Sequence, residues 1–535
     1  MTGSPPTALR PQHPSPRSLR GLAEAFGFEV RGRIDELDVT GVAISTGAVH
    51  GGDLYVGVPG RNAHGADYAA KAAANGAIAL LTDVAGAERA ADAGLPILVT
   101  PDARAALGEV AAWIHRTAEN PAALFGVTGT NGKTSVVYLL YAILRQLGVT
   151  AGLTSTAERR IGDEAVTSSL TTPEASELHA LLARMREVDV RAVGIEVSAQ
   201  ALSRHRVDGI VFDVVGFTNL SHDHLDDYAS MSEYFHAKRE LFTPERARRG
   251  VVTIESEWGA RLVAESRIPV TTLAIGEDAP DAPDAPGAPD APGAPGAPGA
   301  DADWRLDVLE EAPTHTAFRL TGPGGRELAT RIPLIGRYNA ANAALAIVML
   351  VEAGNDLDLI AAAVADHGID AYIPGRTERV SGTRGPVVYI DYGHTPDAFA
   401  HALDAIRRTT DGRVVMVFGA DGDRDTTKRA QMGAIAARGA DVVVITDFHP
   451  RWEDPAAIRA ALVEGARAAV PDREIHEIAD QRAAFRAALA LVGEGDAILY
   501  AGPGHEDYQE VAGVKHPYSA RDDARLALQE AGWLE

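Results

Sequence analysis

Short apolar runs alternate with alanine-rich amphipathic segments along most of this chain, most clearly in its last third. Strand-like runs separated by segments of helical length are typical of a parallel sheet covered by helices. Ligands bind such folds beyond the carboxyl ends of the strands. The pattern therefore predicts an α/β protein whose last third is a doubly wound unit, with strands at Val387–Ile390, Val414–Phe418, Val442–Ile445 and Ala497–Tyr500.

A glycine-rich segment follows a strand-like stretch at 122–125 and opens an amphipathic helical pattern. Backbone N–H groups at such a helix start attract phosphate, and the helix dipole favours the same charge. Lys133 would reach the β- and γ-phosphates, and Thr134 would hold Mg²⁺. The usual spacing requires a glycine where this chain has Val127, and Gly126 comes one residue early. The context nevertheless predicts a nucleotide phosphate site over Gly126–Ser135.

Composition narrows the class of protein. The 535 residues, of which 46% are hydrophobic, suffice for three or four domains with buried cores. A net charge of −24 argues against nucleic acid or an anionic membrane as the main partner. The chain has no cysteine, which excludes disulfides and thiolate metal sites. No apolar run reaches transmembrane length, and residues 1–20 lack an apolar signal core, so we expect a cytoplasmic protein with a disordered tail at 1–20.

Residues 279–300 differ from the rest of the chain because they repeat Asp-Ala-Pro and then Gly-Ala-Pro. Such a segment neither buries a core nor propagates a helix. Strand-like runs, Thr271–Ile275 and Trp304–Val308, flank it. We therefore expect an extended low-complexity insertion at 279–300 inside one domain.

A series of ordered motifs resembles the Mur ligase family over nearly the whole chain, and in particular the members that add the third peptide residue to a peptidoglycan precursor. The resemblance implies an N-terminal UDP-binding α/β domain at 21–121, a central P-loop ATPase domain with a parallel sheet at 122–373, and a C-terminal Rossmann-like domain at 374–535. The motifs are Thr128-Gly-Thr-Asn-Gly-Lys-Thr134, Thr171-Thr-Pro-Glu174, Glu196-Val-Ser198, 217–226, Ala237-Lys238, Gly336-Arg-Tyr-Asn-Ala-Ala-Asn342, Pro374-Gly-Arg376, 391–397, Gly422-Asp-Arg424 and Gly504-His-Glu506.

The resemblance implies an ATP-dependent ligase that joins a diamino acid to the D-Glu of UDP-MurNAc-L-Ala-D-Glu through an acyl phosphate. The expected partners are small molecules, namely ATP, the UDP-muramoyl-dipeptide and the diamino acid, with Mg²⁺ as cofactor. Neither nucleic acid nor stable membrane insertion is expected, and the family implies a monomer. Three alternatives stay open at this point: a D-Ala-D-Ala-adding Mur ligase, a folylpolyglutamate-synthase-like enzyme, and a catalytically inactive nucleotide-binding regulator.

The resemblance assigns the chemistry to a small charged set. Lys133 would neutralise phosphate charge in the transition state. Glu196 and His224 are similar to family Mg²⁺ ligands, with Thr134 completing the set. Lys238 matches a lysine that the family carbamylates, which requires a neutral amine. The predicted catalytic residues are Lys133, Lys238, Glu196 and His224, and the predicted metal ligands are Thr134, Glu196, His224 and Lys238 as its carbamate. Taken singly, a lone Glu or His is usually structural, and Lys238 would be an exposed helix lysine.

The same resemblance implies two further sets of contacts. The nucleotide would be bound by Gly129, Thr130, Asn131, Gly132, Lys133, Thr134, Ser135, Asn219, Asn339, Asn342, Arg376 and Asp391. The UDP-linked substrate would be bound by Thr46, Thr171, Thr172, Ser198, Arg204 and Arg206. Helix capping is the alternative for the threonines and asparagines that stand at helix starts. The uridine motif departs from the family, because Ser45-Thr46-Gly47 replaces Asp-Ser-Arg.

The incoming amine is expected at His449, Arg451, Gly504 and Glu506. Here the chain departs from the diaminopimelate-adding members: Phe448-His-Pro-Arg451 replaces Asp-Asn-Pro-Arg, and Gly502-Pro-Gly-His-Glu506 replaces Gly-Lys-Gly-His-Glu. Arg451 would pair with a carboxylate, and Glu506 with an ammonium. The sequence leaves meso-diaminopimelate, lysine, ornithine and diaminobutyrate open.

Overall fold

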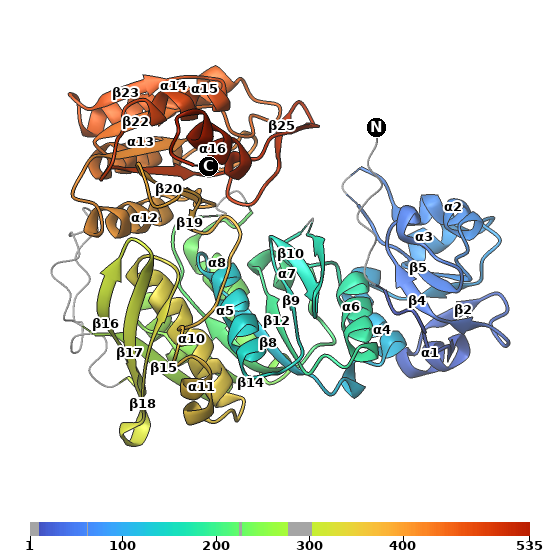
Figure 1. Cartoon of the computed structure of the whole chain (residues 1–535). Helices are drawn as coiled ribbons and strands as arrows, with labels where there is room; N and C mark the ends of the chain where they lie inside the picture. The colour runs from blue at the N-terminus through green and yellow to red at the C-terminus, as the bar shows by residue number, and fades with distance from the viewer. Residues whose placement is uncertain (1–9, 61, 169, 224–226, 277–301, 535) are drawn as a thin grey trace.

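The computed structural model describes residues 10–60, 62–168, 170–223, 227–276 and 302–534, and its strands form three main sheets that follow one another along the chain (Figure 1). The first sheet has the order β2-β7-β6-β5-β4, with β2 antiparallel at one edge and the others parallel. Its strands are β2 (Glu29–Arg31), β4 (Gly41–Ala43), β5 (Asp53–Gly57), β6 (Ala79–Thr82) and β7 (Ile97–Val99). The helices of this domain are α1 (Leu19–Phe26), α2 (Ala69–Ala74), α3 (Val84–Arg89) and α4 (Ala103–His115).

The expected disordered tail at 1–20 is wrong from residue 10 onward. Arg17–Ser18 form strand β1, which pairs with β3 (Asp38–Val39), and α1 begins at Leu19. The Arg10 guanidinium binds the buried carboxylate of Asp53. These contacts offset the entropy lost in ordering the segment. The sequence pattern missed them because their partners lie far along the chain. Residues 1–9 lie outside the described part.

The central sheet has the order β11-β10-β9-β12-β8-β13-β14-β15-β16-β17-β18. Its middle, from β9 to β16, is parallel, which confirms the predicted parallel sheet, and antiparallel hairpins extend both edges. The strands are β8 (Ala123–Thr128), β9 (Ala151–Thr154), β10 (Glu158–Ile161), β11 (Glu164–Thr167), β12 (Ala192–Glu196), β13 (Phe212–Phe217), β14 (Ala247–Thr253), β15 (Val270–Ile275), β16 (Trp304–Ala312), β17 (His315–Thr321) and β18 (Glu327–Ile332).

The low-complexity segment predicted at 279–300 lies outside the described residues. The strands on either side of it, β15 and β16, pair with each other in the central sheet. The chain therefore leaves and re-enters the same sheet around this segment.

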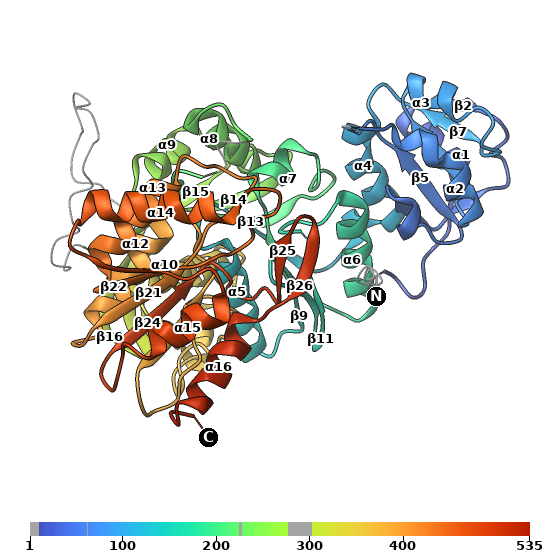
Figure 2. The same ribbon diagram turned by 90° about the horizontal axis from the view of Figure 1, so that it is seen from above.

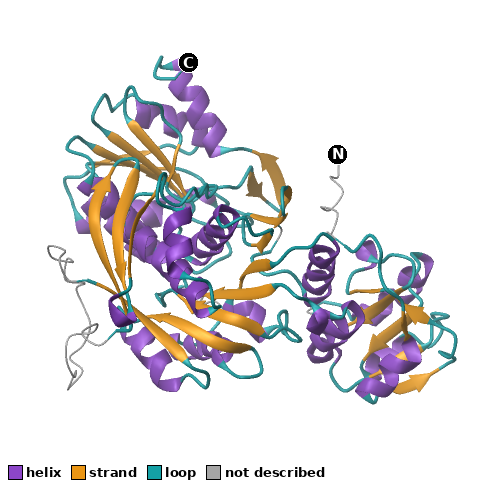
Figure 3. Ribbon diagram, turned by 60° about the horizontal axis from the view of Figure 1, so that its bottom comes forward, coloured by secondary structure: helices purple, strands orange, loops and turns teal. Residues whose placement is uncertain are grey.

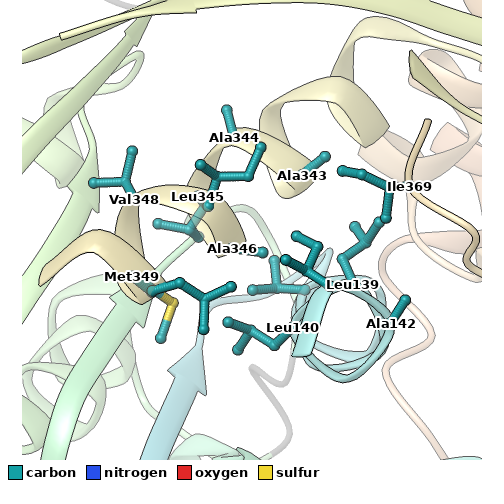
Figure 4. Packing of buried hydrophobic residues seen from close by; sticks show 14 of the residues in the cluster. Leu139, Leu140, Ala142, Ala343, Ala344, Leu345, Ala346, Val348, Met349 and Ile369 are labelled. Atoms are coloured by element: carbon teal, nitrogen blue, oxygen red, sulfur yellow. The ribbon is translucent and has the colours of Figure 1, made fainter. Parts of the chain in front are cut away.

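Two long helices cover the middle of the central sheet. α5 (Lys133–Gln146) packs against α10 (Arg337–Glu352) through fully buried side chains such as Leu140 and Met349 (Figure 4). The same sheet positions glycine at close approaches, since a Cβ on Gly216 would lie 2.6 Å from the Met349 sulfur. The remaining helices here are α6 (Ala175–Glu187), α7 (Ala199–Ser203), α8 (Met231–Arg239), α9 (Glu257–Glu265) and α11 (Leu357–Ala363).

The last sheet confirms the doubly wound unit predicted for the final third. Its order is β19-β20-β24-β21-β22-β23, parallel except for β19. The strands are β19 (Glu378–Arg379), β20 (Val387–Asp391), β21 (Val414–Phe418), β22 (Val442–Ile445), β23 (Glu474–Glu477) and β24 (Ala497–Ala501), followed by the hairpin β25 (Tyr508–Val511) and β26 (Val514–Pro517). Its helices are α12 (Pro396–Arg408), α13 (Arg429–Gly439), α14 (Pro455–Ala469), α15 (Gln481–Leu489) and α16 (Ala520–Glu530).

The N-terminal and C-terminal domains flank the central domain. The N-terminal domain stands on one side of the central sheet and the C-terminal domain on another, and the view from above keeps these two apart (Figures 1 and 2). Figure 3 shows strands flanked by helices in all three. Within the described ranges, no helix is both long and apolar enough to cross a membrane.

Candidate active site between the central and C-terminal domains

A cavity of about 1470 Å³ lies where the central and C-terminal domains meet. Its walls are the segments that follow β8, β12 and β13 of the central sheet and β20, β21 and β24 of the last sheet. Both sheets therefore present the carboxyl ends of their parallel strands to the same space, which is where α/β folds bind ligands.

The glycine-rich loop forms one wall of this cavity. Gly126, which the spacing first placed in the phosphate cradle, lies inside β8, so the loop proper begins at Gly129. Gly129 (φ 148°) and Gly132 (φ 85°) adopt backbone angles that L side chains avoid. A Cβ on Gly129 would lie 1.9 Å from Thr218 Oγ1. The loop is thus pressed against the segment after β13, and its backbone N–H groups lie at the start of α5.

Lys133 begins α5 and folds over this loop. Its Nζ donates to the carbonyl oxygens of Gly129 (3.0 Å) and Thr130 (2.8 Å). Burial lowers the pKa of Lys133, whereas the nearby Glu196 carboxylate raises it. Within the described residues, the hydrogen-bond partners of this ammonium are two carbonyl oxygens, which a bound phosphate would replace at a gain.

Lys238 is a buried residue and not the exposed helix lysine that its sequence context suggested. It is 1% exposed on α8, and its Nζ donates to the Gly129 carbonyl oxygen at 2.7 Å. The same Nζ lies 4.3 Å from the ring centroid of Tyr234. Burial holds the pKa of Lys238 well below its usual value, and the charge of Lys133 lowers it further. These surroundings favour the neutral amine.

Glu196 is the last residue of β12 and contacts the end of the glycine-rich loop through Thr134. It is 2% exposed, and its Oε2 accepts hydrogen bonds from Thr134 Oγ1 (3.0 Å) and from the backbone N–H of Thr156 (2.9 Å). The Thr156 hydroxyl donates to the same carboxylate at 3.1 Å. Thr156 was not among the predicted residues, although a polar residue just after the parallel strand β9 is the available signal.

The donor set fits a hard divalent cation. Glu196 and Thr134 present a carboxylate and a hydroxyl, the oxygen ligands that Mg²⁺ prefers, and this ion takes its other ligands from phosphates and water in nucleotide sites. No group of three or more His, Cys, Asp or Glu side chains is arranged for a metal in the part of the chain that the structure describes. His224, predicted as a catalytic residue and metal ligand, lies outside that part.

The C-terminal domain reaches across the cavity to the loop. Arg376 Nη2 donates to Thr134 Oγ1 at 2.9 Å, and its Cζ lies 4.4 Å from the ring centroid of Tyr392. Arg376 Nε is buried and has no hydrogen-bond partner among the described residues. Asn131 Nδ2 also donates to Asp397 Oδ2 of the C-terminal domain at 3.2 Å. The two domains therefore meet directly at the phosphate loop. The Nε–H group of Arg376 is still available there to donate to a ligand.

Four further residues predicted to bind the nucleotide line the same cavity. Asn219 and Asn342 line the cavity, and Asn219 Oδ1 accepts from the backbone N–H of Asn131 at 2.9 Å. Asn339 is 1% exposed and donates to the Ile335 carbonyl oxygen, while Asp391 accepts from the N–H groups of residues 377 and 393. Asn339 and Asp391 are thus occupied within the protein although both border the cavity.

The predicted substrate residues lie at different places. Thr171, Ser198 and Arg206 line the cavity, whereas Thr46, Thr172 and Arg204 do not. The Thr172 hydroxyl is fully buried and donates to the Glu196 carbonyl oxygen at 2.7 Å. Arg206 pairs at 2.9 Å with Glu174. Glu174 is the N-cap residue of α6, which starts at Ala175. Thr46 stands in the N-terminal domain at the start of a short 3-10 helix.

The predicted acceptor residues cluster at the opposite end of the cavity. His449 Nδ1 accepts from the backbone N–H of Glu510 at 2.9 Å, so the proton of the neutral ring is on Nε2, which donates to Glu506 Oε2 at 2.7 Å. Arg451 (φ 51°) pairs with Asp421 at 3.3 Å and with Glu510 at 3.6 Å. Asp421 Oδ1 is buried without a hydrogen bond within the described residues. Asp421 and Glu506 line this end of the cavity together with Arg451 and Lys515, so it offers carboxylates to a ligand ammonium and cations to a ligand carboxylate.

Glycines bring the acceptor loop against the first turn of the C-terminal domain. A Cβ on Gly375 (φ 64°) would lie 2.2 Å from the carbonyl carbon of Gly504. A Cβ on Gly504 (φ 48°) would in turn lie 2.6 Å from the Tyr392 side chain. Both positions require a residue without a side chain. The loop that carries Glu506 is thereby packed next to the residue that precedes Arg376.

Three family models match this chain. The model described as Mur ligase middle domain matches residues 127–350, that described as Mur ligase, glutamate ligase domain matches residues 375–504, and that described as Mur ligase family, catalytic domain matches residues 38–114.

Relatives match over the same length. A UDP-N-acetylmuramyl-tripeptide synthetase of Leifsonia xyli is 70% identical over 535 residues, covering 100% of each chain. A UDP-N-acetylmuramoyl-L-alanyl-D-glutamate--2,6-diaminopimelate ligase of Streptomyces coelicolor is 44% identical, covering 98% of this chain and 99% of its own.

Solved structures share the fold. A UDP-N-acetylmuramoyl-L-alanyl-D-glutamate--2,6-diaminopimelate ligase superposes with a TM-score of 0.64 at 24% identity, covering 96% of this chain and 99% of its own. FolC of E. coli gives a TM-score of 0.54 at 20% identity and covers 75% of this chain and 90% of its own. Because the family models and the relatives together span the N-terminal, central and C-terminal domains, the chain belongs to the Mur ligase family, whose members are ATP-dependent ligases that require Mg²⁺.

Proposed function

We propose that this protein adds a diamino acid to the D-Glu carboxylate of UDP-MurNAc-L-Ala-D-Glu, using ATP, in the synthesis of peptidoglycan precursors. The observation that carries the proposal is the group of Lys133, Lys238 and Glu196 around the glycine-rich loop, with Arg376 reaching it from the other domain. The names of the relatives at 70% and 44% identity support the tripeptide step.

The competing functions have weaker support. A folylpolyglutamate-synthase-like activity is disfavoured because the similarity to FolC covers 75% of this chain, whereas a Mur ligase model also matches residues 38–114. An inactive regulator would have no need for two lysines, one of them fully buried, at a phosphate loop. The Mur ligases that add D-Ala-D-Ala share this fold. The relatives at 70% and 44% identity, however, are named for the addition of the third peptide residue.

The reaction would proceed in two steps at the loop. An oxygen of the D-Glu carboxylate attacks the γ-phosphorus of ATP, and ADP leaves; the amine then attacks the carbonyl carbon, loses a proton, and inorganic phosphate leaves. Lys133 and Arg376 would exchange their present carbonyl and hydroxyl partners for phosphate oxygens and so stabilise the charge that develops there. Glu196 and Thr134 would hold Mg²⁺, which neutralises phosphate charge when bound.

Carbamylation of Lys238 is part of the proposal. A carbamate forms when a neutral amine attacks carbon dioxide, and the burial that lowers the pKa of Lys238 supports the neutral form. The variant Lys238→Ala should lose activity and regain part of it with a short carboxylic acid such as acetate. Lys71→Ala, an exposed helix lysine, is the matched control. Full activity of Lys238→Ala would remove the lysine from the mechanism.

The acceptor would bind near His449, Arg451, Gly504 and Glu506. Glu506, which is bonded to His449, and Asp421, which is paired with Arg451, offer negative charge for a side-chain ammonium, which supports a diamino acid. Burial, followed by Glu506 and Glu510, raises the pKa of the Tyr508 hydroxyl, while Arg451 opposes this shift.

The decisive experiment measures ADP release by the purified protein with ATP, Mg²⁺ and UDP-MurNAc-L-Ala-D-Glu. Each of meso-diaminopimelate, lysine, ornithine and diaminobutyrate is supplied in turn, and the product is weighed by mass spectrometry. We expect ADP release that depends on both substrates and a product heavier by one diamino acid residue. The proposal would be contradicted if none of the four amino acids supported ADP release. It would also be contradicted if ADP were released at the same rate without the UDP-linked substrate. The cytoplasmic location, the monomeric state and the domain limits 21–121, 122–373 and 374–535 remain predictions.

A further inference from the structure

The N-terminal segment carries a guanidinium into the first sheet. Arg10 Nη1 and Nη2 donate to Asp53 Oδ2 and Oδ1 at 2.9 and 2.7 Å, a two-bond pair with little exposure on either side chain. Asp53 opens β5 and is 1% exposed. Two parallel charge-assisted bonds to a buried carboxylate are among the strongest polar contacts that a protein makes.

The strand beside Asp53 leaves room for this guanidinium. Gly41 of β4 stands opposite Asp53 in the parallel register. A Cβ on Gly41 would lie 2.2 Å from Arg10 Nη2 and 2.4 Å from Asp53 Oδ1. Any other residue at position 41 would therefore displace the pair, which makes the pocket for Arg10 a built feature of the sheet.

The same segment is held a second time by the central domain. The backbone N–H groups of Gln12 and His13 donate to Glu187 Oε2 and Oε1 at 2.8 and 2.7 Å. Glu187 is the last residue of α6. Burial tends to raise the pKa of the Glu187 carboxyl, but the two backbone N–H groups and Arg184 hold it below its usual value. The carboxylate is thus bound as an anion.

We propose that residues 10–13 form a brace between β5 of the N-terminal domain and the end of α6 in the central domain, and that Arg10 is a positioning residue for the UDP-linked substrate. The family model for the N-terminal domain begins at residue 38, so the brace lies outside it. The brace holds α6 at the end opposite to Glu174, the residue that directly precedes the helix.

The brace acts on two parts of the proposed substrate path. Asp53 Oδ2 also accepts from the backbone N–H of His50 at 2.9 Å, so the Arg10 pair fixes the turn at 50–53, which follows closely on the 3-10 helix Thr46–Ala48. Glu174, at the start of α6, binds Arg206, which lines the cavity. Release of the brace would let the uridine end and the peptide end of the substrate lose their mutual alignment, and small misplacements of this kind slow enzymes markedly.

The test combines breaks at both ends of the brace. We expect Arg10→Ala and Glu187→Ala each to raise the KM for UDP-MurNAc-L-Ala-D-Glu by roughly tenfold, with the KM for ATP and kcat near the wild-type values. The double variant should be no worse than either single one, because either break releases the same link. Arg10→Lys, which keeps the charge but not the two-bond geometry, should be intermediate. Arg20→Ala removes an exposed ion pair with Asp35 and is the control.

A second readout does not depend on activity. In wild type, the amides of Gln12 and His13 should be protected from hydrogen exchange, and either single variant should expose them. Independent and additive effects of the two variants on KM, or unprotected amides in wild type, would overturn the brace. The inference rests on the proposed function only for the choice of substrate; a wild type without turnover would instead refute the function, and the exchange result would still decide on the brace.

Discussion

The interface between the N-terminal and central domains contains two buried histidines that should make its stability depend on pH. His179 on α6 is fully buried; Thr117 Oγ1 donates to its Nδ1 at 2.7 Å, and its Nε2–H donates to the carbonyl oxygen of Asp208 at 2.9 Å. His115, the last residue of α4, lies close to His179, Arg10 and Arg186 and is 5% exposed. Among the described residues, no carboxylate is hydrogen-bonded to either imidazole, although the charge of Asp208 opposes the lowering at His179.

Burial lowers the pKa of His179 from 6.5 to about 4, and burial with the charge of its neighbours lowers that of His115 to about 3. Because the folded pKa values are depressed, the unfolded chain binds protons first as pH falls. The stability is complete above pH 6.5 and is lost between pH 6.5 and the folded values. For His179 alone, a shift of this size corresponds to about 3 kcal/mol, at up to about 1.4 kcal/mol per pH unit.

The assay compares urea denaturation of wild type and His179→Gln at several pH values between 7.5 and 4.5 and at constant ionic strength. Glutamine can keep both hydrogen bonds but does not titrate. We expect the stability of wild type to fall more steeply with decreasing pH than that of the variant, by about 1 kcal/mol per unit below pH 6. His367→Gln, at an exposed histidine, is the control and should leave the slope unchanged. Equal slopes for wild type and His179→Gln would refute the reasoning.

Three further outcomes are expected at the active site. Arg376→Lys should lower kcat by roughly 10²-fold, because an aligned donor to the phosphate is lost, and steady-state ADP release measures it; an unchanged kcat would separate Arg376 from the reaction. His449→Gln should raise the KM of the diamino acid by roughly tenfold or more, since the bond to the Glu506 carboxylate is disturbed, while the KM for ATP serves as the internal control and should not move. Gly504→Ala should cost about 1 to 3 kcal/mol of stability, because the φ of 48° and the Tyr392 contact both oppose a side chain; a thermal melt equal to that of wild type would count against this account.

The sequence pattern anticipated the features that depend on local order. The parallel strands of the last third and the loop around Lys133 follow from apolar runs and glycine spacing, both of which are short-range signals. The ordered motifs also assign both Glu196 and Arg376 to the ATP site, and in the structure both residues line the same cavity.

Contacts between distant segments were beyond the pattern. Nothing near Lys238 in the sequence indicates that it is buried, because the burial comes from packing of α8 on the phosphate loop. The Arg10–Asp53 pair joins residues 43 positions apart, and the tail composition around Arg10 favoured disorder. Thr172 was assigned to the ligand, yet its hydroxyl is spent on the Glu196 carbonyl oxygen, a contact that only the fold creates.

The glycine contact between residues 375 and 504 joins the two loops that we propose for ATP and for the amino acid. Residue 375 precedes the arginine that reaches the phosphate loop, and residue 504 is two positions before Glu506, the carboxylate that we propose as a contact of the amine. A ligand that settles one of these loops therefore alters the other. Binding linkage is reciprocal, so whatever factor ATP adds to the affinity for the amino acid, the amino acid must add to the affinity for ATP. Titrations of each in the presence of the other should return the same number.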